Sequence, residues 1–450
     1  MTRERTQLVE FFAASCHPFL GKERKKSRLS FASRTSIGAP LAKRSMKRRI
    51  KTIVKAQLIR SAFLLLLLVL ICVIEFAWGQ WPIGGPATTE KATGVACTPG
   101  WSAGPDMPST GVRMVGVYFP ANGKFYAIGG RSMDGVGSDF MHPFEYDPAS
   151  NAWAIISASY PDNRVSNMAC GVLTDSGTPY IYCVGGSAGG QTTATARVFR
   201  YDPVVDMIES IAAPWPGDSD GITLPGGFSV FDNKLYILGG FRINTAMIDQ
   251  IWEFTPTSNM WVLKNAVLPV PRGYIPTATY FGVIYTAGGS DWDGTTLVDT
   301  NDSFKYDPVA DLITTVTNIP RATGETRALK FAGPISPCSP AIWVIGGGRT
   351  PPNPSNEVDT FCPGGPPPEW RMGSPFVTAR RNFATDTDVG DPSFGTAHIW
   401  LAGGYANDGV TPLSSTEIYC HVVPTPTEPP PPPVRVRPTP RPRPSQAPRP

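Results

Sequence analysis

Arginine recurs at two places around a repeated Gly-Gly pair in this chain of 450 residues. One set precedes an apolar run and consists of Arg113, Arg164, Arg272, Arg321 and Arg380, which Arg381 follows. The other set follows the glycines and consists of Arg131, Arg242 and Arg349. Guanidinium groups bind planar anions in a bidentate way, so a cluster of them would favour a carboxylate, sulfate or phosphate ligand. The alternative is that each arginine pairs with a nearby acid or carbonyl group.

One carboxylate lies among these arginines. Glu325, in the stretch ATGETRAL, is flanked by Arg321 and Arg327. A glutamate beside arginines is suited to proton transfer, so Glu325 is the one candidate for a catalytic residue. The alternative is an exposed loop carboxylate without a catalytic role.

Metal and cofactor chemistry is not expected from this sequence. No two cysteines have the C-x-x-C spacing of a metal site, and the aspartate-rich stretch SDWDGTTLVDTNDS lacks the bidentate Glu of a calcium loop. The stretch GGSAGG follows an apolar strand and opens no helix, which argues against a phosphate-binding loop. We therefore predict neither a metal nor a cofactor.

The elements that must position the arginines form an internal repeat. A Gly-Gly pair ends six apolar stretches, and the first glycines of these pairs are Gly129, Gly185, Gly239, Gly288, Gly346 and Gly403. About fifteen residues after each pair comes an aromatic residue, at Tyr146, Tyr201, Phe254, Tyr306, Phe361 and Tyr419. A further strand then opens with Trp153, Trp261 or Trp370, and repeats two and four carry Ile208 and Ile313 near that position.

Six in-register copies of this pattern resemble the kelch motif over roughly residues 97–420. The resemblance implies an all-β fold, a six-bladed β-propeller of four-stranded blades. Alternating strands such as KLYILGG independently favour radial stacking of sheets, because they need a second apolar face. In an antiparallel blade the start of the inner strand and the end of the second strand meet at one edge. Both sets of arginines would therefore share one face of the propeller.

The last repeat lacks an outer strand, because the chain turns into polyproline soon after Tyr419. The stretch ACTPGWSAGPDMP at residues 96–108 matches the outer-strand segment of the other repeats, with Trp101 in the tryptophan position. We therefore expect the N-terminal strand around Trp101 to close the last blade.

Composition divides the chain into four parts. Residues 1–45 form a basic extension that suggests an over-extended start, residues 46–79 a signal peptide or signal anchor, residues 80–423 the propeller, and residues 424–450 a Pro/Arg-rich disordered tail. Residues 80–423 carry 19 basic and 31 acidic residues. The basic residues thus lie largely outside the folded body, and nucleic acid is not an expected partner.

The apolar segment at residues 62–74, AFLLLLLVLICVI, has the length of a signal-peptide core and is short for a membrane span. Ala77 and Gly79 supply the small residues that signal peptidase needs, so we expect cleavage before Gln80. The alternative is an uncleaved anchor with its basic end in the cytoplasm. In either case the propeller would be secreted, periplasmic or at the cell surface.

Six cysteines follow this segment: Cys97, Cys170, Cys183, Cys338, Cys362 and Cys420. An even number in an exported chain suggests disulfides, with fifteen possible connectivities. Cys170 and Cys183 bracket a hairpin, and Cys338 is the expected partner of Cys362. Cys97 and Cys420 would then clasp the two chain ends across the closing blade.

The sequence predicts a monomeric, exported propeller that binds a protein or an anionic glycan through its arginine-bearing face, with the membrane contacted only through an uncleaved anchor. The alternative class is a carbohydrate-active enzyme, because the chain has a general resemblance to the six-bladed kelch sialic-acid mutarotases, which implies acid–base chemistry at Glu325. The copper chemistry of galactose-oxidase propellers is not expected, since the four histidines are too scattered to converge on the axis.

Overall fold

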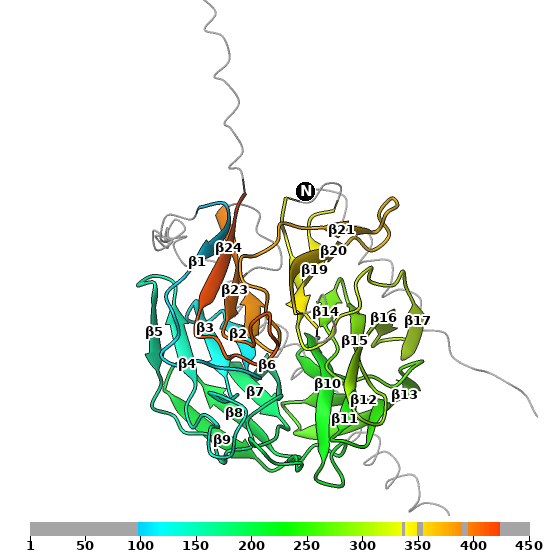
Figure 1. Cartoon of the computed structure of the whole chain (residues 1–450). Coiled ribbons are helices and arrows are strands. Elements are labelled where there is room, and N and C mark those ends of the chain that lie inside the picture. The colour runs from blue at the N-terminus through cyan, green and yellow to red at the C-terminus, as the bar shows by residue number, and fades with distance from the viewer. Residues whose placement is uncertain (1–97, 335–337, 349–353, 389–394, 424–450) are drawn as a thin grey trace, which may run out of the picture. The chain divides into compact units, whose positions relative to one another are not determined.

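The computed structural model describes residues 98–334, 338–348, 354–388 and 395–423. The described residues form 24 β-strands and no helix. These strands pair into six four-stranded antiparallel sheets, which Figure 1 shows as blades around a common axis. The predicted all-β, six-bladed propeller is therefore confirmed.

Each blade runs from an inner strand at the axis to an outer strand at the rim. Blade one holds β2 (Val115–Phe119), β3 (Lys124–Ile128), β4 (Phe144–Asp147) and β5 (Ala152–Ile155). Blade two holds β6 (Ala169–Asp175), β7 (Thr178–Val184), β8 (Val198–Asp202) and β9 (Met207–Ile211). Blade three holds β10 (Thr223–Phe231), β11 (Lys234–Arg242), β12 (Ala246–Thr255) and β13 (Met260–Val267). Blade four holds β14 (Thr277–Tyr280), β15 (Val283–Trp292), β16 (Leu297–Asp307) and β17 (Leu312–Thr315). Blade five holds β18 (Ala328–Phe331), β19 (Ala341–Gly347), β20 (Ser355–Phe361) and β21 (Trp370–Met372). Blade six holds β22 (Ala384–Thr387), β23 (Gly395–Ala402), β24 (Thr416–Val423) and β1 (Gly100–Ala103).

The repeated aromatic residue of each third strand lies directly opposite the residue that the sequence places on the outer strand. The six cross-strand pairs are Tyr146 with Trp153, Tyr201 with Ile208, Phe254 with Trp261, Tyr306 with Ile313, Phe361 with Trp370, and Tyr419 with Trp101. Cross-strand pairs of this kind stabilise a sheet through side-chain packing. The repeat thus fixes the register of each blade's outer half.

The same aromatic residues also join neighbouring blades. An aromatic of the second strand contacts the third-strand aromatic of the next blade at five junctions: Tyr126 with Tyr201, Tyr182 with Phe254, Tyr236 with Tyr306, Tyr285 with Phe361, and Trp343 with Tyr419. Their ring centroids are 5.3–6.2 Å apart. Each sheet is therefore buried on both faces, as radial stacking requires.

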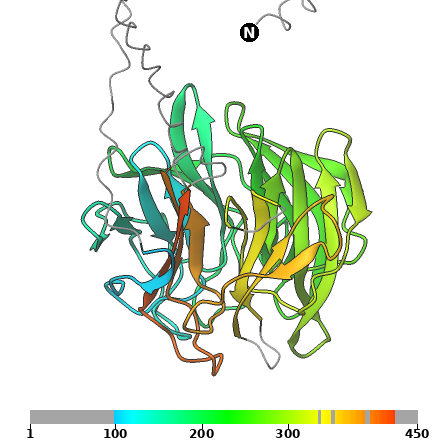
Figure 2. The ribbon, with the colours of Figure 1, turned by 90° about the horizontal axis from the view of Figure 1, so that it is seen from above.

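The chain's first and last described strands close the ring. Strand β1 pairs with β24, so that Trp101 lies opposite Tyr419 and Gly100 opposite Cys420, and Figures 1 and 2 show the two strands side by side. Closure by the N-terminal strand around Trp101 is therefore confirmed. Because β1 comes from the far end of the chain, blade six forms only when both ends of the propeller are in place.

The glycine pairs allow the blades to approach closely near the axis. Gly129 and Gly130 have φ of 66° and 81°, which L side chains rarely adopt. A Cβ atom on Gly129 would also collide with the carbonyl oxygen of Val165 in the next blade. Glycine is needed here for both conformation and space.

Two of the predicted disulfides are present. Cys170 bonds with Cys183 across the β6–β7 hairpin, and Cys338 bonds with Cys362. Cys420 is also disulfide-bonded, but Cys97 lies outside the described residues, so a Cys97–Cys420 bond stays a prediction. The expected leader, its cleavage before Gln80 and the proline-rich tail also fall outside the described residues. Within the described residues, no helix is long and apolar enough to span a membrane.

Candidate functional site

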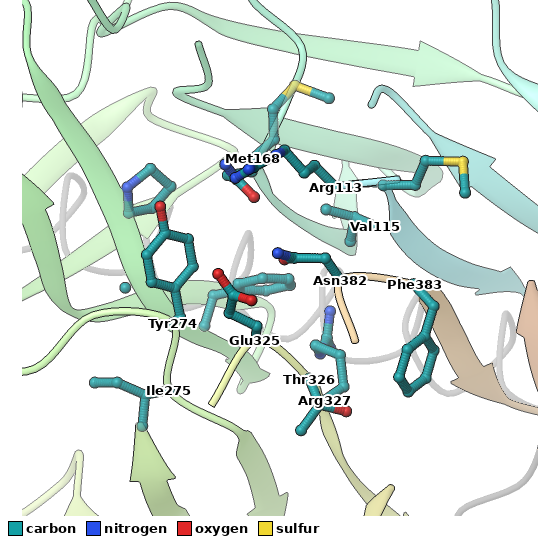
Figure 3. Close-up of a pocket in the computed structure, with 15 residues that line it drawn as sticks. Arg113, Val115, Met168, Tyr274, Ile275, Glu325, Thr326, Arg327, Asn382 and Phe383 are labelled. Carbon is teal, nitrogen blue, oxygen red and sulfur yellow. The ribbon is translucent and has the colours of Figure 1, made fainter. Parts of the chain in front are cut away.

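One residue from each of five blades lies at the axis in a left-handed backbone conformation. These are Arg113, Asn167, Tyr274, Glu325 and Asn382, with φ of 60°, 59°, 49°, 56° and 52°. Their amides bond in sequence around the axis: Asn167 donates to the carbonyl of Arg113 (3.0 Å), Arg113 to Asn382 (2.8 Å), Asn382 to Glu325 (2.7 Å) and Glu325 to Tyr274 (3.1 Å). We call these five residues the axial ring. Figure 3 shows four of them around one cavity.

Three members of the axial ring adopt a conformation that is unusual for their residue type. Positive φ is uncommon for residues other than Gly, Asn and Asp, and Arg113, Tyr274 and Glu325 all have it. Such a residue costs about 1–3 kcal/mol and persists only where the surroundings enforce its conformation. The amide–carbonyl chain around the axis provides that constraint. Because strain of this kind gathers at functional sites, the axial ring marks the candidate site.

Three cavities follow one another along the axis. The upper cavity, of about 440 Å³, lies at the end where the inner strands begin, and the waist, of about 60 Å³, is lined by the axial ring. The lower cavity, of about 330 Å³, lies between the inner strands towards their hairpins. Arg113, Asn167 and Tyr274 line both the upper cavity and the waist, while Phe228 and Arg327 line both the waist and the lower cavity.

The upper cavity has one charged wall and one aromatic wall. Arg113, Arg131 and Asp134 of blade one line one part of it. Phe241 and Trp292 line another part together with Tyr274, and the ring of Phe241 lies 5.9 Å from that of Tyr274 and 5.6 Å from that of Trp292. Aromatic faces beside guanidinium groups suit a ligand that combines an anionic group with a flat or apolar part.

The charged wall holds more positive than negative groups. Arg131 Nη2 lies 2.7 Å from Asp134 Oδ1, and Arg113 Nε lies 3.4 Å from the same oxygen. Arg113 also donates to the hydroxyl of Tyr405 at 3.0 Å. The side chain of Asp134 is 51% exposed, whereas those of Arg113 and Arg131 are only 13% and 9% exposed. One half-exposed carboxylate thus pairs with two largely buried guanidinium groups.

Asp134 remains a carboxylate despite its partial burial. Burial alone would raise its pKa, but Arg113, Tyr405 and Arg131 together hold the pKa of Asp134 below its ordinary value. Burial likewise acts to lower the pKa of Arg113, and Tyr405, Tyr274, Glu325 and Asp134 outweigh it, so that the pKa of Arg113 is raised. Arg113 and Asp134 are therefore both ionised at neutral pH.

Of the predicted arginines that the structure describes, Arg113 and Arg131 line an axial cavity and the others line none of the three. Four others pair with acids of their own or a neighbouring strand: Arg242 with Asp220 (2.6 Å), Arg272 with Asp302 (2.6 Å), Arg321 with Asp359 (2.9 Å) and Arg380 with Glu417 (2.8 Å). Arg164 is half-buried and lines none of the three cavities, and Arg349 lies outside the described residues. Together with Arg113 and Arg131, which pair with Asp134, six of the eight arginines thus pair with local acids, the alternative raised by the sequence. A ligand-binding role for the eight stays a prediction.

Glu325 lines the waist, beneath the arginines, and its side chain is fully buried. The expectation of an exposed loop carboxylate is therefore wrong: the left-handed backbone at Glu325 turns this side chain towards the axis. Its carboxylate is ion-paired with Arg381, whose guanidinium lies 4.4 Å from the centre of the Tyr405 ring.

Sequence reasoning missed most of the axial ring and the aromatic wall. The ring residues precede the Gly-Gly pairs by 14 to 21 residues, because the intervening hairpins differ in length, so no fixed spacing reveals them. Tyr405 and Trp292 follow glycine pairs by one and three residues, which is a signal that a search for aromatic as well as basic residues would have found. Among the described residues, no group of three or more His, Cys, Asp or Glu side chains is placed to hold a metal.

No family model matches the chain. It is similar to Kelch-like protein terF of Aspergillus terreus, with 28% identity over 37% of this chain and 36% of that protein. It is also similar to Kelch repeat and BTB domain-containing protein 1 of cowpox virus, with 23% identity over 48% of this chain and 35% of that protein. A third relative is mouse Kelch-like protein 35, with 31% identity over 30% of this chain and 20% of that protein. The chain thus spans about a third or less of these relatives' length.

Among solved structures, the chain is similar to the one titled "Structure of YjhT". The two share 12% sequence identity with a TM-score of 0.52, over 70% of this chain and 95% of that one. At this level of identity the likeness concerns the fold alone. The curated relatives and this structural neighbour agree with the repeat pattern and with the six blades.

Proposed function

Because the chain is a six-bladed β-propeller of kelch repeats, a class of domain that generally mediates protein interactions, we propose that it is a binding module whose upper cavity holds an acidic segment of a partner protein. One observation carries this proposal. Two largely buried guanidinium groups, those of Arg113 and Arg131, share the single exposed carboxylate of Asp134 at the mouth of a 440 Å³ cavity.

A carboxylate of the ligand would take the place that Asp134 occupies on these guanidinium groups. Arg131 would offer Nη2, the atom that lies 2.7 Å from Asp134 Oδ1. The aromatic wall of Phe241, Tyr274 and Trp292 would receive an apolar or aromatic side chain next to the acid. A glycan that carries a carboxylate shares this chemistry. An array of acidic peptides and carboxylated glycans, described below, separates the two ligand classes.

Acid–base catalysis at Glu325, the alternative raised by the sequence, has less support. A general acid or base must reach the proton that it transfers. The carboxylate of Glu325 is instead ion-paired with Arg381 and its side chain is fully buried. The waist that Glu325 lines, at about 60 Å³, is also far smaller than the cavity that a sugar needs.

The propeller is further proposed to act outside the cytoplasm. Two disulfides within the described residues support this, because disulfides form and persist mainly in oxidising compartments. The apolar segment at residues 62–74 supports export in the same way.

The proposal is tested by the change of Arg113 and Arg131 together to Gln. Acidic peptides and carboxylated glycans are first arrayed, and the best ligand is titrated into the full-length chain. Charge-assisted hydrogen bonds contribute about 1.5–3 kcal/mol each, so the loss of one from each arginine should weaken binding by about 100-fold or more and reduce its dependence on salt.

The matched control is Arg200→Gln. Arg200 is also paired with acids, Asp175 and Glu209, but it lies on the third strand of blade two and lines no axial cavity. Affinity should be unchanged in this variant. If the double variant binds as tightly as the unmodified chain, the upper cavity is not the site, and a glycan as the best ligand would contradict the choice of a protein partner.

A further inference from the structure

The lower cavity lies at the opposite end of the axis from the proposed protein-binding site. Residues of the inner strands β2, β6 and β10 line it together with Arg327 and the end of β22. Its volume of about 330 Å³ lies within the range of small-molecule sites. Part of its wall is apolar and is formed by Val117, Val172 and Val230.

Arg327 is half-buried and, among the described residues, has no ion pair. Among the described residues, its Nε and Nη1 are buried and have no hydrogen-bond partner. Its guanidinium lies 4.0 Å from the centre of the Phe228 ring, and Figure 3 shows Arg327 among the residues around the waist. By contrast, Arg380 and Arg381, which are more deeply buried, are paired with Glu417 and Glu325.

The acids nearest to Arg327 do not neutralise it by contact. Asp386 lines the same cavity and attracts Arg327 through space, but one of its carboxylate oxygens accepts the amide of Tyr118 at 2.7 Å. The neighbouring Asp388 is paired with His398 at 2.6 Å. Burial lowers the pKa of Arg327 and raises that of Asp386. Both shifts show that the attraction between Arg327 and Asp386 offsets the effect of burial only in part.

An isolated cation inside a protein is costly unless an anion or several hydrogen bonds compensate it. A guanidinium group that lines a cavity and has no ion pair among the described residues is suited to bind a carboxylate. The surrounding valines and Phe228 would accept an apolar body of a few carbon atoms. The cavity therefore suits a ligand that has one carboxylate and a short apolar part.

We propose that the lower cavity binds a small organic monocarboxylate, with the carboxylate on Arg327 and its apolar part against Val117, Val172 and Val230. This site is separate from the upper cavity and does not depend on the proposed protein ligand. The upper and lower cavities are joined by the waist. At about 60 Å³, the waist is too small for one small molecule to extend through it from one cavity into the other.

Benzoate and butyrate are the probes, and their neutral amides, benzamide and butyramide, are the matched controls. Each is titrated calorimetrically into the full-length chain in a buffer without chloride or other carboxylates. We expect saturable one-to-one binding of at least one carboxylate and at least tenfold weaker binding of its amide. Arg327→Met should weaken carboxylate binding at least tenfold, while Arg200→Gln and the Arg113→Gln, Arg131→Gln double variant should leave it unchanged.

Arg327→Met is expected to fold, since it removes a cation that has no ion pair among the described residues and keeps an apolar side chain next to Phe228. If it does not fold, Arg327→Lys tests the same point, because it keeps the charge but loses the bidentate fork, and Val172→Trp tests the cavity by filling it. Both should weaken binding at least tenfold. Absence of saturable binding of both carboxylates, equal binding of acid and amide, or undiminished binding to the folded Arg327 variants would each overturn the proposal.

Discussion

Replacement of Glu417 by Ala is expected to destabilise the propeller by about 3–5 kcal/mol, the cost of breaking a buried ion pair by removing one partner. The side chain of Arg380 is fully buried, and its Nη2 lies 2.8 Å from Glu417 Oε1. Glu417 also accepts the amides of Val377 (2.6 Å) and Thr378 (2.9 Å), which lead into blade six. The variant would leave a buried guanidinium without its counter-ion and two amides without an acceptor.

The measurement is equilibrium unfolding in urea with the disulfides intact, and the matched control is the double variant Arg380→Met, Glu417→Leu. Replacement of both charges by apolar residues of similar size is often neutral, so the double variant should recover much of the stability that Glu417→Ala loses. A loss of less than about 1 kcal/mol in Glu417→Ala would show that water reaches the pair, since exposed ion pairs contribute no more than that.

Replacement of Trp101 by Ala is expected to cost about 3 kcal/mol, the lower end of the range for large aromatic residues, because Trp101 is only half-buried. Its ring lies 5.1 Å from that of Tyr419 and 5.6 Å from that of Phe376, and its indole N–H donates to the carbonyl of Ser374 at 2.8 Å. These contacts hold the N-terminal strand β1 onto blade six and onto the segment that enters it.

Hydrogen exchange shows where the stability is lost. In Trp101→Ala, the amides of β24 and β23 should exchange faster than those of the other blades. The matched control is Ile313→Ala, at the equivalent position of blade four, which should speed exchange in β16 instead. Uniform acceleration over all six blades in Trp101→Ala would argue that the ring does not open first at its closing blade.

The fold was predictable because its determinants recur. Each repeat carries the same Gly-Gly pair and third-strand aromatic, so six weak signals add up to one strong one. The strand around Trp101 could be assigned to blade six because it fills the one gap in that pattern, and the register of Trp101 with Tyr419 confirms it. The disulfides Cys170–Cys183 and Cys338–Cys362 followed from cysteines close in sequence around single hairpins or strands.

The site was less predictable because its determinants do not recur at a fixed spacing. The sequence placed Arg272 and Arg321 near the axis but could not show that Asp302 and Asp359, on other strands, pair with them. It placed Glu325 near the arginines without its left-handed backbone, which buries the side chain. Nor does any local pattern show that Arg327 has no ion pair among the described residues, since this depends on every strand around the axis.

The central claim is that the upper cavity is the binding surface. Hydrogen exchange of the full-length chain, with and without its best acidic ligand, tests this most directly. The account predicts slower exchange on binding in the segments that line the upper cavity, at residues 131–134, 187–192, 241–244 and 292–297. Slower exchange confined to outer strands such as β13, or to the hairpins beside the lower cavity, would contradict it.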